Sequence, residues 1–280
     1  MHDPRDRDFL YGNDRIDPAF LNQNLGCSIF ASHIIYRASM DSTNALARDL
    51  ALEGSPEGTL VLAEEQTAGR GRRGRIWASP AGQNLLVSIL LRPCIDPEQV
   101  FMLTMVLALV TVRALTRLTG LTPLIKWPND LYVRGKKLAG ILTEFGTKGK
   151  ILDYAVLGMG INVNWHPPQE EGIRHPATSI LAETGRRFSR NELLLEILKG
   201  LEGSYERVLQ GKIEDFYREW NEFSLILGRR VTVESESGTV EGKAVRIDGQ
   251  GALILQEPDG SERRVLCGDV SLGMFTEGRT

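Results

Sequence analysis

A glycine- and arginine-rich segment near residue 70 combines backbone freedom with positive charge. It reads GRGRRGR over residues 69–75 and is called the Gly/Arg loop below. Glycine lets a backbone take positive φ angles and approach a ligand closely, and arginine offers charged, forked donors that suit phosphate and carboxylate. A basic surface loop or a nucleic-acid contact would have the same composition. Gln66 before the loop and Trp77 after it can hydrogen-bond and stack, which favours a ligand site.

A second segment, Lys126-Trp127-Pro128-Asn129-Asp130, places an amide and a carboxylate at a stiff turn. Proline fixes one backbone angle, so the turn can aim Asn129 and Asp130 into a cleft. An Asx-turn, in which such side chains hydrogen-bond only to the nearby backbone, explains the segment equally well. The residues alone leave both interpretations open.

A third segment, KKLAG at residues 136–140, puts lysine at the start of an apolar strand. Charged side chains are rarely buried without a partner, so a bound anion would explain a lysine there. The alternative is that the lysine stem packs on the apolar surface while the ammonium group reaches water. That alternative is the better one for Lys136, and Lys137 is the candidate for contact with an anion.

Two further segments have local explanations beside the functional ones. Glycines inside the strand pattern at 158–164, GMGINVN, mark close approach of the backbone to another group, so that Asn162 could meet a nucleotide. A bulge followed by a turn is the alternative. Ser42, Thr43 and Asn44 stand at a helix start, where capping alone accounts for such residues. Each segment by itself is a weak indication of a site.

The elements that must position these segments are both helices and strands. Apolar patterns predict strands near 34–36, 60–63, 85–91, 125, 131–133, 137–145 and 154–162. Helices are predicted over about 18–25, 42–53, 96–118, 193–209 and 213–223, the fourth after a capping box that begins at Ser189. Beyond Gly228, short strands at 231–233, 239–247, 252–256 and 263–267 alternate with Gly-containing turns, which indicates a small all-β barrel.

Composition disfavours several classes of protein. The 280 residues are 42% hydrophobic and 25% charged, as in an ordinary globular protein, and the net charge of −3 gives no general case for nucleic-acid binding. The three cysteines and four histidines do not cluster, so we expect no protein-ligated metal, no disulfide framework and a reducing, cytoplasmic compartment. The apolar run at 100–112 is shorter than the roughly 20 residues that span a bilayer. It is expected to be a buried helix, and the charged N-terminus lacks the core of a signal peptide.

The order of these segments is far more specific than any one of them. DSTN at 41–44, QTAGRGRRGRxW at 66–77, KWPND at 126–130, KLAGILxE at 137–144 and GxGIN at 158–162 together resemble the biotin–protein ligase family. ATSI at 177–180 resembles a further segment of that family, and the resemblance covers roughly residues 33–275. Lipoate–protein ligases share the general fold but have neither the Gly/Arg loop nor the KWPND segment.

The resemblance implies an α+β fold, with a mixed β-sheet and helices like those of class II aminoacyl-tRNA synthetases and a small C-terminal SH3-like β-barrel. It divides the chain into a lead segment at 1–32, a biotin- and ATP-binding catalytic domain at 33–224 and the barrel at 225–280. Some members carry an N-terminal winged helix and repress transcription. Too few residues precede Ser42 for that domain, so the monofunctional type without DNA binding is expected.

The family reaction uses biotin, ATP and Mg²⁺ to form biotinyl-5′-AMP, and then transfers biotin to a lysine of the biotin carboxyl carrier protein domain of a biotin-dependent carboxylase. The resemblance assigns catalysis to Arg72, Lys137 and Asp130, with Asp130 as the candidate that helps to deprotonate the incoming lysine. The implied biotin-binding residues are Ser42, Thr43, Asn44, Gln66, Arg70, Gly71, Arg72 and Lys137. The implied ATP- or adenylate-binding residues are Arg70, Arg72, Arg73, Arg75, Trp77, Asn129, Lys137 and Asn162. No membrane partner is expected, and a homodimer is left open.

Three other functions fit part of the pattern. A lipoate or octanoate–protein ligase is disfavoured by the Gly/Arg loop, and a biotin-responsive DNA-binding repressor is disfavoured by the short lead segment. The completeness of the motif set argues against a non-catalytic, synthetase-like binding protein.

Overall fold

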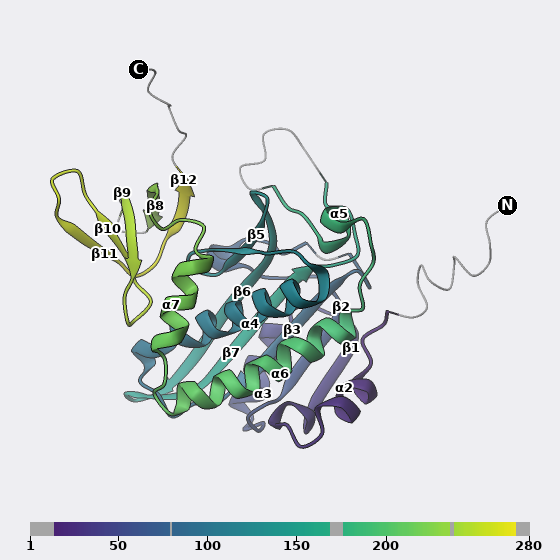
Figure 1. Ribbon diagram of the computed structural model, residues 1–280. Helices are drawn as coiled ribbons and strands as arrows, with labels where there is room; N and C mark the ends of the chain where they lie inside the picture. The colour runs from purple at the N-terminus through teal and green to yellow at the C-terminus, as the bar shows by residue number, and fades with distance from the viewer. Residues whose placement is uncertain (1–13, 79, 169–175, 236–237, 273–280) are drawn as a thin grey trace.

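A seven-stranded mixed sheet forms the centre of the computed structural model, which describes residues 14–78, 80–168, 176–235 and 238–272 (Figure 1). Its strands lie in the order β1-β2-β3-β7-β6-β5-β4, and only β1 and β2 are parallel neighbours. The strands are β1 (Ile34–Met40), β2 (Leu60–Gln66), β3 (Asn84–Leu91), β4 (Leu124–Lys126), β5 (Asp130–Val133), β6 (Lys136–Lys148) and β7 (Ile151–Asn162). The predicted mixed sheet is therefore confirmed.

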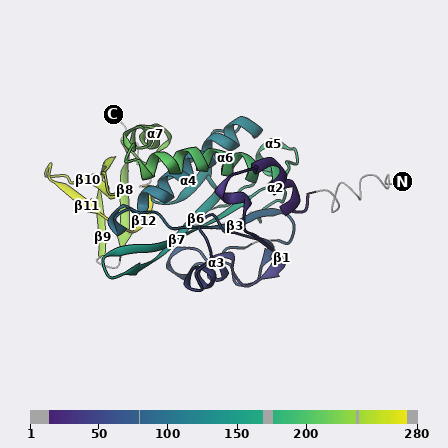
Figure 2. The same ribbon diagram turned by 90° about the horizontal axis from the view of Figure 1, so that it is seen from below.

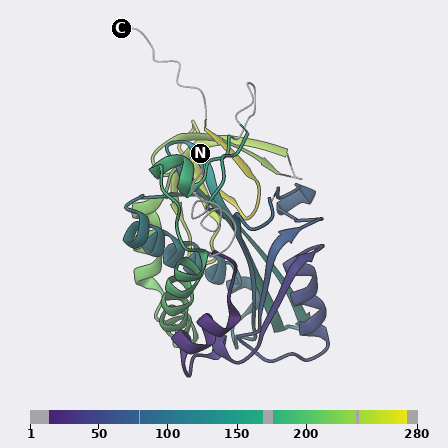
Figure 3. The same ribbon diagram turned by 90° about the vertical axis from the view of Figure 1, so that its right-hand side faces the viewer.

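Helices cover both faces of this sheet. Helix α3 packs on one face, against β2, β3 and β7, while α4 and α6 pack on the other (Figures 2 and 3). The helices are α2 (Pro18–Leu25), α3 (Thr43–Leu52), α4 (Phe101–Thr119), α5 (Ile180–Thr184), α6 (Arg190–Leu209) and α7 (Glu214–Phe223). Short 3-10 turns lie at η1 (Ile29–Ala31), η2 (Arg72–Gly74) and η3 (Pro97–Gln99).

Alternation along β7 separates the core from the opposite face. Successive strand residues point to opposite sides of a sheet. Leu157, Met159 and Ile161 belong to the large hydrophobic core that α4 and α6 cover. Gly158 and Gly160 lie between them and face the α3 side, where the side chains of Asn44 and Trp77 contact them. This stretch of the α3 face is bare backbone, which leaves room for a ligand.

The apolar helix α4 lies in the core. By length and composition, Pro97–Thr119 would be long enough to cross a bilayer, but 72% of its most apolar window is buried inside the protein. The helix packs against α6 and the sheet strands β5, β6 and β7. The buried helix predicted for this part of the chain is confirmed, and it is longer than the apolar run at 100–112 that indicated it.

A second, five-stranded antiparallel sheet follows at the C-terminal end, in the order β11-β10-β9-β8-β12. Its strands are β8 (Arg230–Ser235), β9 (Gly238–Ile247), β10 (Leu253–Gln256), β11 (Glu262–Val265) and β12 (Asp269–Leu272). Four of them match the predicted barrel, and β12 was not anticipated. The Trp127 indole Nε1 donates to the Gly251 carbonyl oxygen at 2.9 Å. A Cβ at Gly251 would lie 1.8 Å from the Phe101 ring, so this barrel packs closely on the first domain.

The expected polar lead contributes to the core over its described part. Ile16, Leu21 and Phe30 are buried. Asp14 pairs with Arg190 at the start of α6, at 3.1 Å, and Arg190 also reaches Glu64 on β2, at 2.7 Å. The Arg190 side chain is only 1% exposed. Burial raises the pKa of the Asp14 carboxyl, and hydrogen bonds from Arg190 oppose that rise. Residues 1–13 lie outside the described part, and the boundaries given for the domains stay predictions.

Arg190→Ala is expected to lower the free energy of unfolding by about 3–5 kcal/mol, because it leaves Glu64 and Asp14 without their cation in a largely buried setting. Urea denaturation of the full chain measures this. Arg117→Ala is the matched control: Arg117 pairs with Glu196 at 2.6 Å but is 72% exposed, so its loss should cost about 0–1 kcal/mol. Equal losses for the two variants would contradict this account of the network.

Candidate active site

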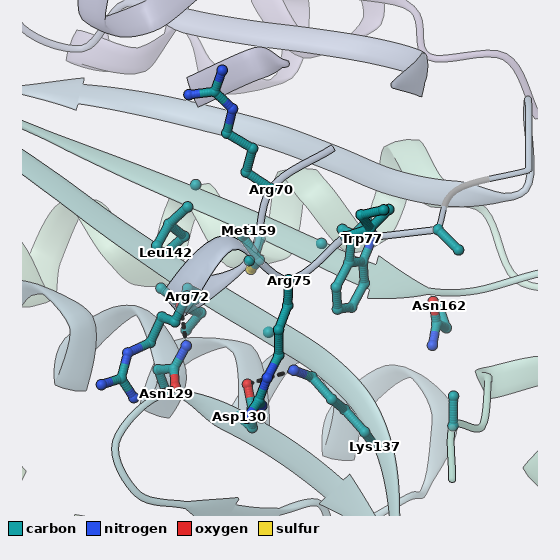
Figure 4. A pocket seen from close by; sticks show the side chains of 18 of the residues that line it. Arg70, Arg72, Arg75, Trp77, Asn129, Asp130, Lys137, Leu142, Met159 and Asn162 are labelled. Atoms are coloured by element: carbon teal, nitrogen blue, oxygen red, sulfur yellow. Dashed lines mark hydrogen bonds and ion pairs between the residues drawn. The ribbon is translucent and has the colours of Figure 1, made fainter. Parts of the chain in front are cut away.

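One cavity of about 470 Å³ opens on the α3 face of the sheet, between the start of α3, the Gly/Arg loop, the 127–129 turn and strands β6 and β7 (Figure 4). All but one of the residues that the sequence nominated line it. They are Ser42, Thr43, Asn44, Gln66, Arg70, Gly71, Arg72, Arg75, Trp77, Asn129, Asp130, Lys137 and Asn162. The exception is Arg73. Arg70 points away from Arg72 and Lys137, so the arginines of the loop do not act as one cluster.

The start of α3 is a polar end of the cavity. Ser42 is the N-cap, and its hydroxyl oxygen accepts from the Ala45 amide, as capping alone predicted. Gln66, at the end of β2, accepts from the Thr43 amide at 2.8 Å and from the Thr43 hydroxyl at 3.1 Å. Capping and ligand contact are therefore compatible, because these residues line the cavity while they hold the helix start.

Trp77 lies against the bare part of the sheet. Gly140 and Gly160 are cross-strand partners on β6 and β7. A Cβ at Gly160 would lie 2.5 Å from the Trp77 ring, and one at Gly140 would lie 3.2 Å from it. Side chains at these positions would displace the indole. The buried Trp77 Nε1 has no hydrogen-bond partner within the described part of the chain, and a buried donor of this kind destabilises the protein until it finds an acceptor.

Lys137 is the cation beside this ring. Its Nζ lies 5.5 Å from the Trp77 ring centroid and 2.8 Å from Asp130 Oδ1. The Lys137 backbone amide donates to the Pro176 carbonyl, and its carbonyl oxygen accepts from the Thr178 amide. Both main-chain groups are thus fixed while the side chain remains at the cavity wall. Lys136 is not among the described residues that line the cavity, in line with the assignment of Lys137 as the anion contact.

The 127–129 turn connects the Gly/Arg loop to the sheet. Arg72 Nη1 donates to Asn129 Oδ1 at 3.3 Å and to the Gly268 carbonyl at 3.4 Å. The Asn129 amide group donates to the Ile141 carbonyl oxygen, which fixes its orientation. Burial lowers the pKa of the Arg72 guanidinium, and the carboxylates of Asp269 and Asp130 oppose that change. The side chains of the turn therefore do more than make local Asx-turn contacts.

The barrel reaches the cavity through Asp269 at the start of β12. Asp269 forms ion pairs with Arg75 and, at 3.2 Å, with Arg73. Arg73 also donates to the Glu234 carbonyl oxygen at 3.2 Å, so the structure turns this residue to the barrel and not to the cavity. The assignment of Arg73 to ATP is not supported by this geometry. Sequence reasoning missed Asp269 because β12 was not predicted, and no spacing relates it to a loop 194 residues away.

Four aromatic or basic residues of the cavity wall were also missed: Lys126, Trp127, Tyr132 and Trp165. The Lys126 Nζ lies 5.2 Å from the Tyr132 ring centroid. Burial lowers the pKa of the Lys126 ammonium group, while Asp130 raises it. Lys126 is the first residue of the KWPND segment, so its proximity in sequence to Asn129 and Asp130 could have indicated that it lines the same site.

Asn162 closes the cavity at the end of β7. Its Nδ2 donates to the Thr178 carbonyl oxygen at 2.9 Å, which ties the strand to the 177–180 segment. Residues 169–175 of the connection between them lie outside the described part. Asn162 therefore has at least a structural role, and its expected contact with adenine stays a prediction.

Known proteins share both domains. A model of the Biotin/lipoate A/B protein ligase family matches residues 36–162, and one of the Biotin protein ligase C terminal domain matches residues 226–273. The Bifunctional ligase/repressor BirA of Bacillus subtilis is 34% identical over 252 residues, which are 89% of this chain and 77% of that protein. The Biotin–[acetyl-CoA-carboxylase] ligase of Mycobacterium tuberculosis is 35% identical over 241 residues, 83% of this chain and 86% of that protein.

The chain belongs to the biotin protein ligase family. A solved structure of the biotin protein ligase from Aquifex aeolicus in complex with biotin and ATP superposes with a TM-score of 0.72 and 32% identity, covering 86% of this chain and 99% of that one. The family inferred from the order of the motifs is thereby confirmed. The same structural similarity confirms the predicted α+β fold class, and it includes both the mixed sheet and the C-terminal sheet.

The Gly/Arg loop is expected to exchange its amide hydrogens faster without ligand than with biotinyl-adenylate. Backbone bonds from Gly71 to Arg75 and from Trp77 to Gly69 close it into a small hairpin, and its exposed ion pairs to Asp269 are weak. A phosphate would add charge-assisted bonds. Hydrogen exchange of residues 69–75 measures the difference, with the buried amides of α4 as the reference. Equal protection in both states would contradict this expectation.

Proposed function

We propose that this protein is a biotin–[acetyl-CoA-carboxylase] ligase. It forms biotinyl-5′-AMP from biotin and ATP and transfers biotin to a lysine of a biotin carboxyl carrier protein domain. The observation that carries the proposal is the cavity itself. A polar helix end, a glycine floor and the cations Arg72, Arg75 and Lys137 surround one space. That combination suits a ligand with a buried polar ring at one end and a reacting carboxylate at the other.

In the first step, a carboxylate oxygen of biotin attacks the α-phosphorus of ATP, and the bond to pyrophosphate breaks. Both reactants are anions, so they approach only if cations offset their repulsion. Lys137 and Arg72 supply that charge from fixed positions, and preorganised charge is commonly a large part of catalysis. Mg²⁺ arrives with ATP as part of the substrate, because it binds mainly to phosphates and one or two carboxylates.

In the second step, the amine of the carrier lysine attacks the acyl carbon, the bond to AMP breaks, and the amine loses a proton. We propose Asp130 as the group that helps to take this proton. Its Oδ1 lies 2.8 Å from Lys137 Nζ. A phosphate that recruits Lys137 would draw the ammonium away from Asp130, and the carboxylate would then be available to accept.

The partner and the compartment follow from the same proposal. The carrier protein is the macromolecular substrate, and the reaction takes place in the cytoplasm, where ATP and reduced thiols are plentiful. We also propose that the protein does not bind DNA sequence-specifically, because the net charge of its 280 residues is −3.

Incubation with a carrier domain tests the proposed function. Labelled biotin, MgATP and the carrier should give a carrier with one added biotin, and the same mixture with lipoate or octanoate should give none. Replacement of the carrier's acceptor lysine by alanine should abolish labelling. Transfer of lipoate with no transfer of biotin would contradict the proposal and favour the related ligases.

Lys137→Ala is expected to reduce biotin-dependent pyrophosphate exchange by about 10²–10³-fold, because it removes a cation aimed at the developing negative charge. Lys137→Arg should rescue poorly, since a planar fork differs from a compact ammonium group. Lys136→Ala is the control and should keep nearly normal exchange. Thermal melting of each variant separates chemistry from unfolding. Near-normal exchange by a folded Lys137→Ala protein would remove this lysine from the mechanism.

A further inference from the structure

Two residues without a role in the reaction described above, Ser88 on β3 and Glu144 on β6, contact the amide of Asn44. Asn44 Nδ2 donates to the Leu142 carbonyl oxygen at 3.1 Å and to Glu144 Oε2 at 2.8 Å. Ser88 Oγ lies 2.6 Å from Asn44 Oδ1 and 2.8 Å from Thr43 Oγ1. Ser88 is fully buried, and Asn44 is 5% exposed and lines the cavity. Two strands of the sheet therefore reach one ligand-facing side chain.

The chemistry of these partners decides which way the Asn44 amide points. An asparagine amide has two N–H hydrogens and one oxygen with two acceptor positions. The Leu142 carbonyl and the Glu144 carboxylate only accept, so the nitrogen must face them. The reverse orientation would set oxygen against oxygen at both contacts. Oδ1 then faces Ser88, whose hydroxyl can donate. Both amide hydrogens of Asn44 are therefore already in hydrogen bonds. Asn44 can make one further hydrogen bond, as an acceptor through the second lone pair of Oδ1.

We propose that Glu144 and Ser88 are positioning residues that hold Asn44 as an acceptor, so that Asn44 accepts a hydrogen bond from a ring N–H of the biotin ureido group. This inference rests on the proposed function. The ureido group carries two N–H donors and one carbonyl acceptor, and an acceptor matches only the donors. Gly158 makes the arrangement possible, because a Cβ there would lie 1.8 Å from Asn44 Oδ1.

Biotin-dependent pyrophosphate exchange by the full chain tests the proposal. Glu144→Ala frees one Asn44 hydrogen and lets the amide turn, so the KM for biotin should rise by about 2–10-fold, the worth of one hydrogen bond. The KM for ATP and kcat should stay nearly unchanged. Ser88→Ala should act in the same direction. Glu144→Gln keeps an acceptor oxygen in a similar shape and should restore most of the affinity.

Biotin analogues methylated at one or the other ring nitrogen test the polarity of the contact. Methylation removes a donor and adds bulk, and the bulk is the same for every variant. The ratio of KM values therefore isolates the hydrogen bond, as in a double-mutant cycle. For each protein, the penalty is the KM for the analogue divided by the KM for biotin. For one of the two analogues, this ratio should be smaller in Glu144→Ala than in the unmodified protein. Equal penalties for both analogues in both proteins would overturn the proposal.

A matched pair outside the cavity provides the control. Ser39 Oγ on β1 lies 3.3 Å from Glu65 Oε2 on β2, so Ser39→Ala and Glu65→Ala remove a similar contact without touching Asn44. Both should leave the KM for biotin unchanged. A lower melting temperature with an unchanged KM in Glu144→Ala and Ser88→Ala would mean a merely structural role and overturn the proposal. Failure of the unmodified protein to exchange pyrophosphate with biotin would instead contradict the proposed function.

Discussion

The site depends on the absence of side chains from one small area of the sheet. Gly158 and Gly160 on β7 and Gly140 on β6 face α3 within two neighbouring strands. Because side chains alternate along a strand, the residues between them, such as Met159 and Ile161, point into the core and hold the same strands in place. The strands are therefore firmly packed on one face and bare on the other. Asn44 and Trp77 fill part of that area and define the walls of the cavity.

A second constraint comes from charge. Arg72, Arg75, Lys126 and Lys137 line one cavity, and such a set would repel itself without anions. Asp130 and Asp269 supply negative charge from within the protein, one from the sheet and one from the barrel. Phosphate and carboxylate groups of substrates carry the same charge and can take over these cations. The arrangement explains why the barrel, which holds none of the nominated residues, still lies at the edge of the site.

The sequence was sufficient to predict local elements but not their long-range partners. The start of α3 at Ser42 and the strand that leads into Asn162 follow from capping and periodicity. Lys137 and Asp130 were both nominated, and their ion pair follows from the pairing of β5 with β6. The resemblance to the family assigned Arg73 to ATP together with its neighbours, yet the backbone of the loop turns it to the barrel. A motif of this kind does not resolve which arginines of a short loop face inward.

Contacts between distant segments were beyond prediction because no local pattern encodes them. Arg190 was placed at the start of a helix, but its partners Asp14 and Glu64 come from the lead segment and from β2. Ser88 was part of an apolar strand pattern, and only the fold sets it beside Asn44. The polarity of the cavity around Asn44 is therefore a property of the three-dimensional structure, although each contributing residue is visible in the sequence.

The central claim is that this cavity joins biotin to AMP. Native mass spectrometry of the protein after mixing with biotin and MgATP, without carrier, tests it most directly. The account predicts a protein-bound species with the mass of biotinyl-5′-AMP and release of pyrophosphate. A folded protein that binds biotin and ATP separately, yet never retains the adenylate or releases pyrophosphate, would contradict it.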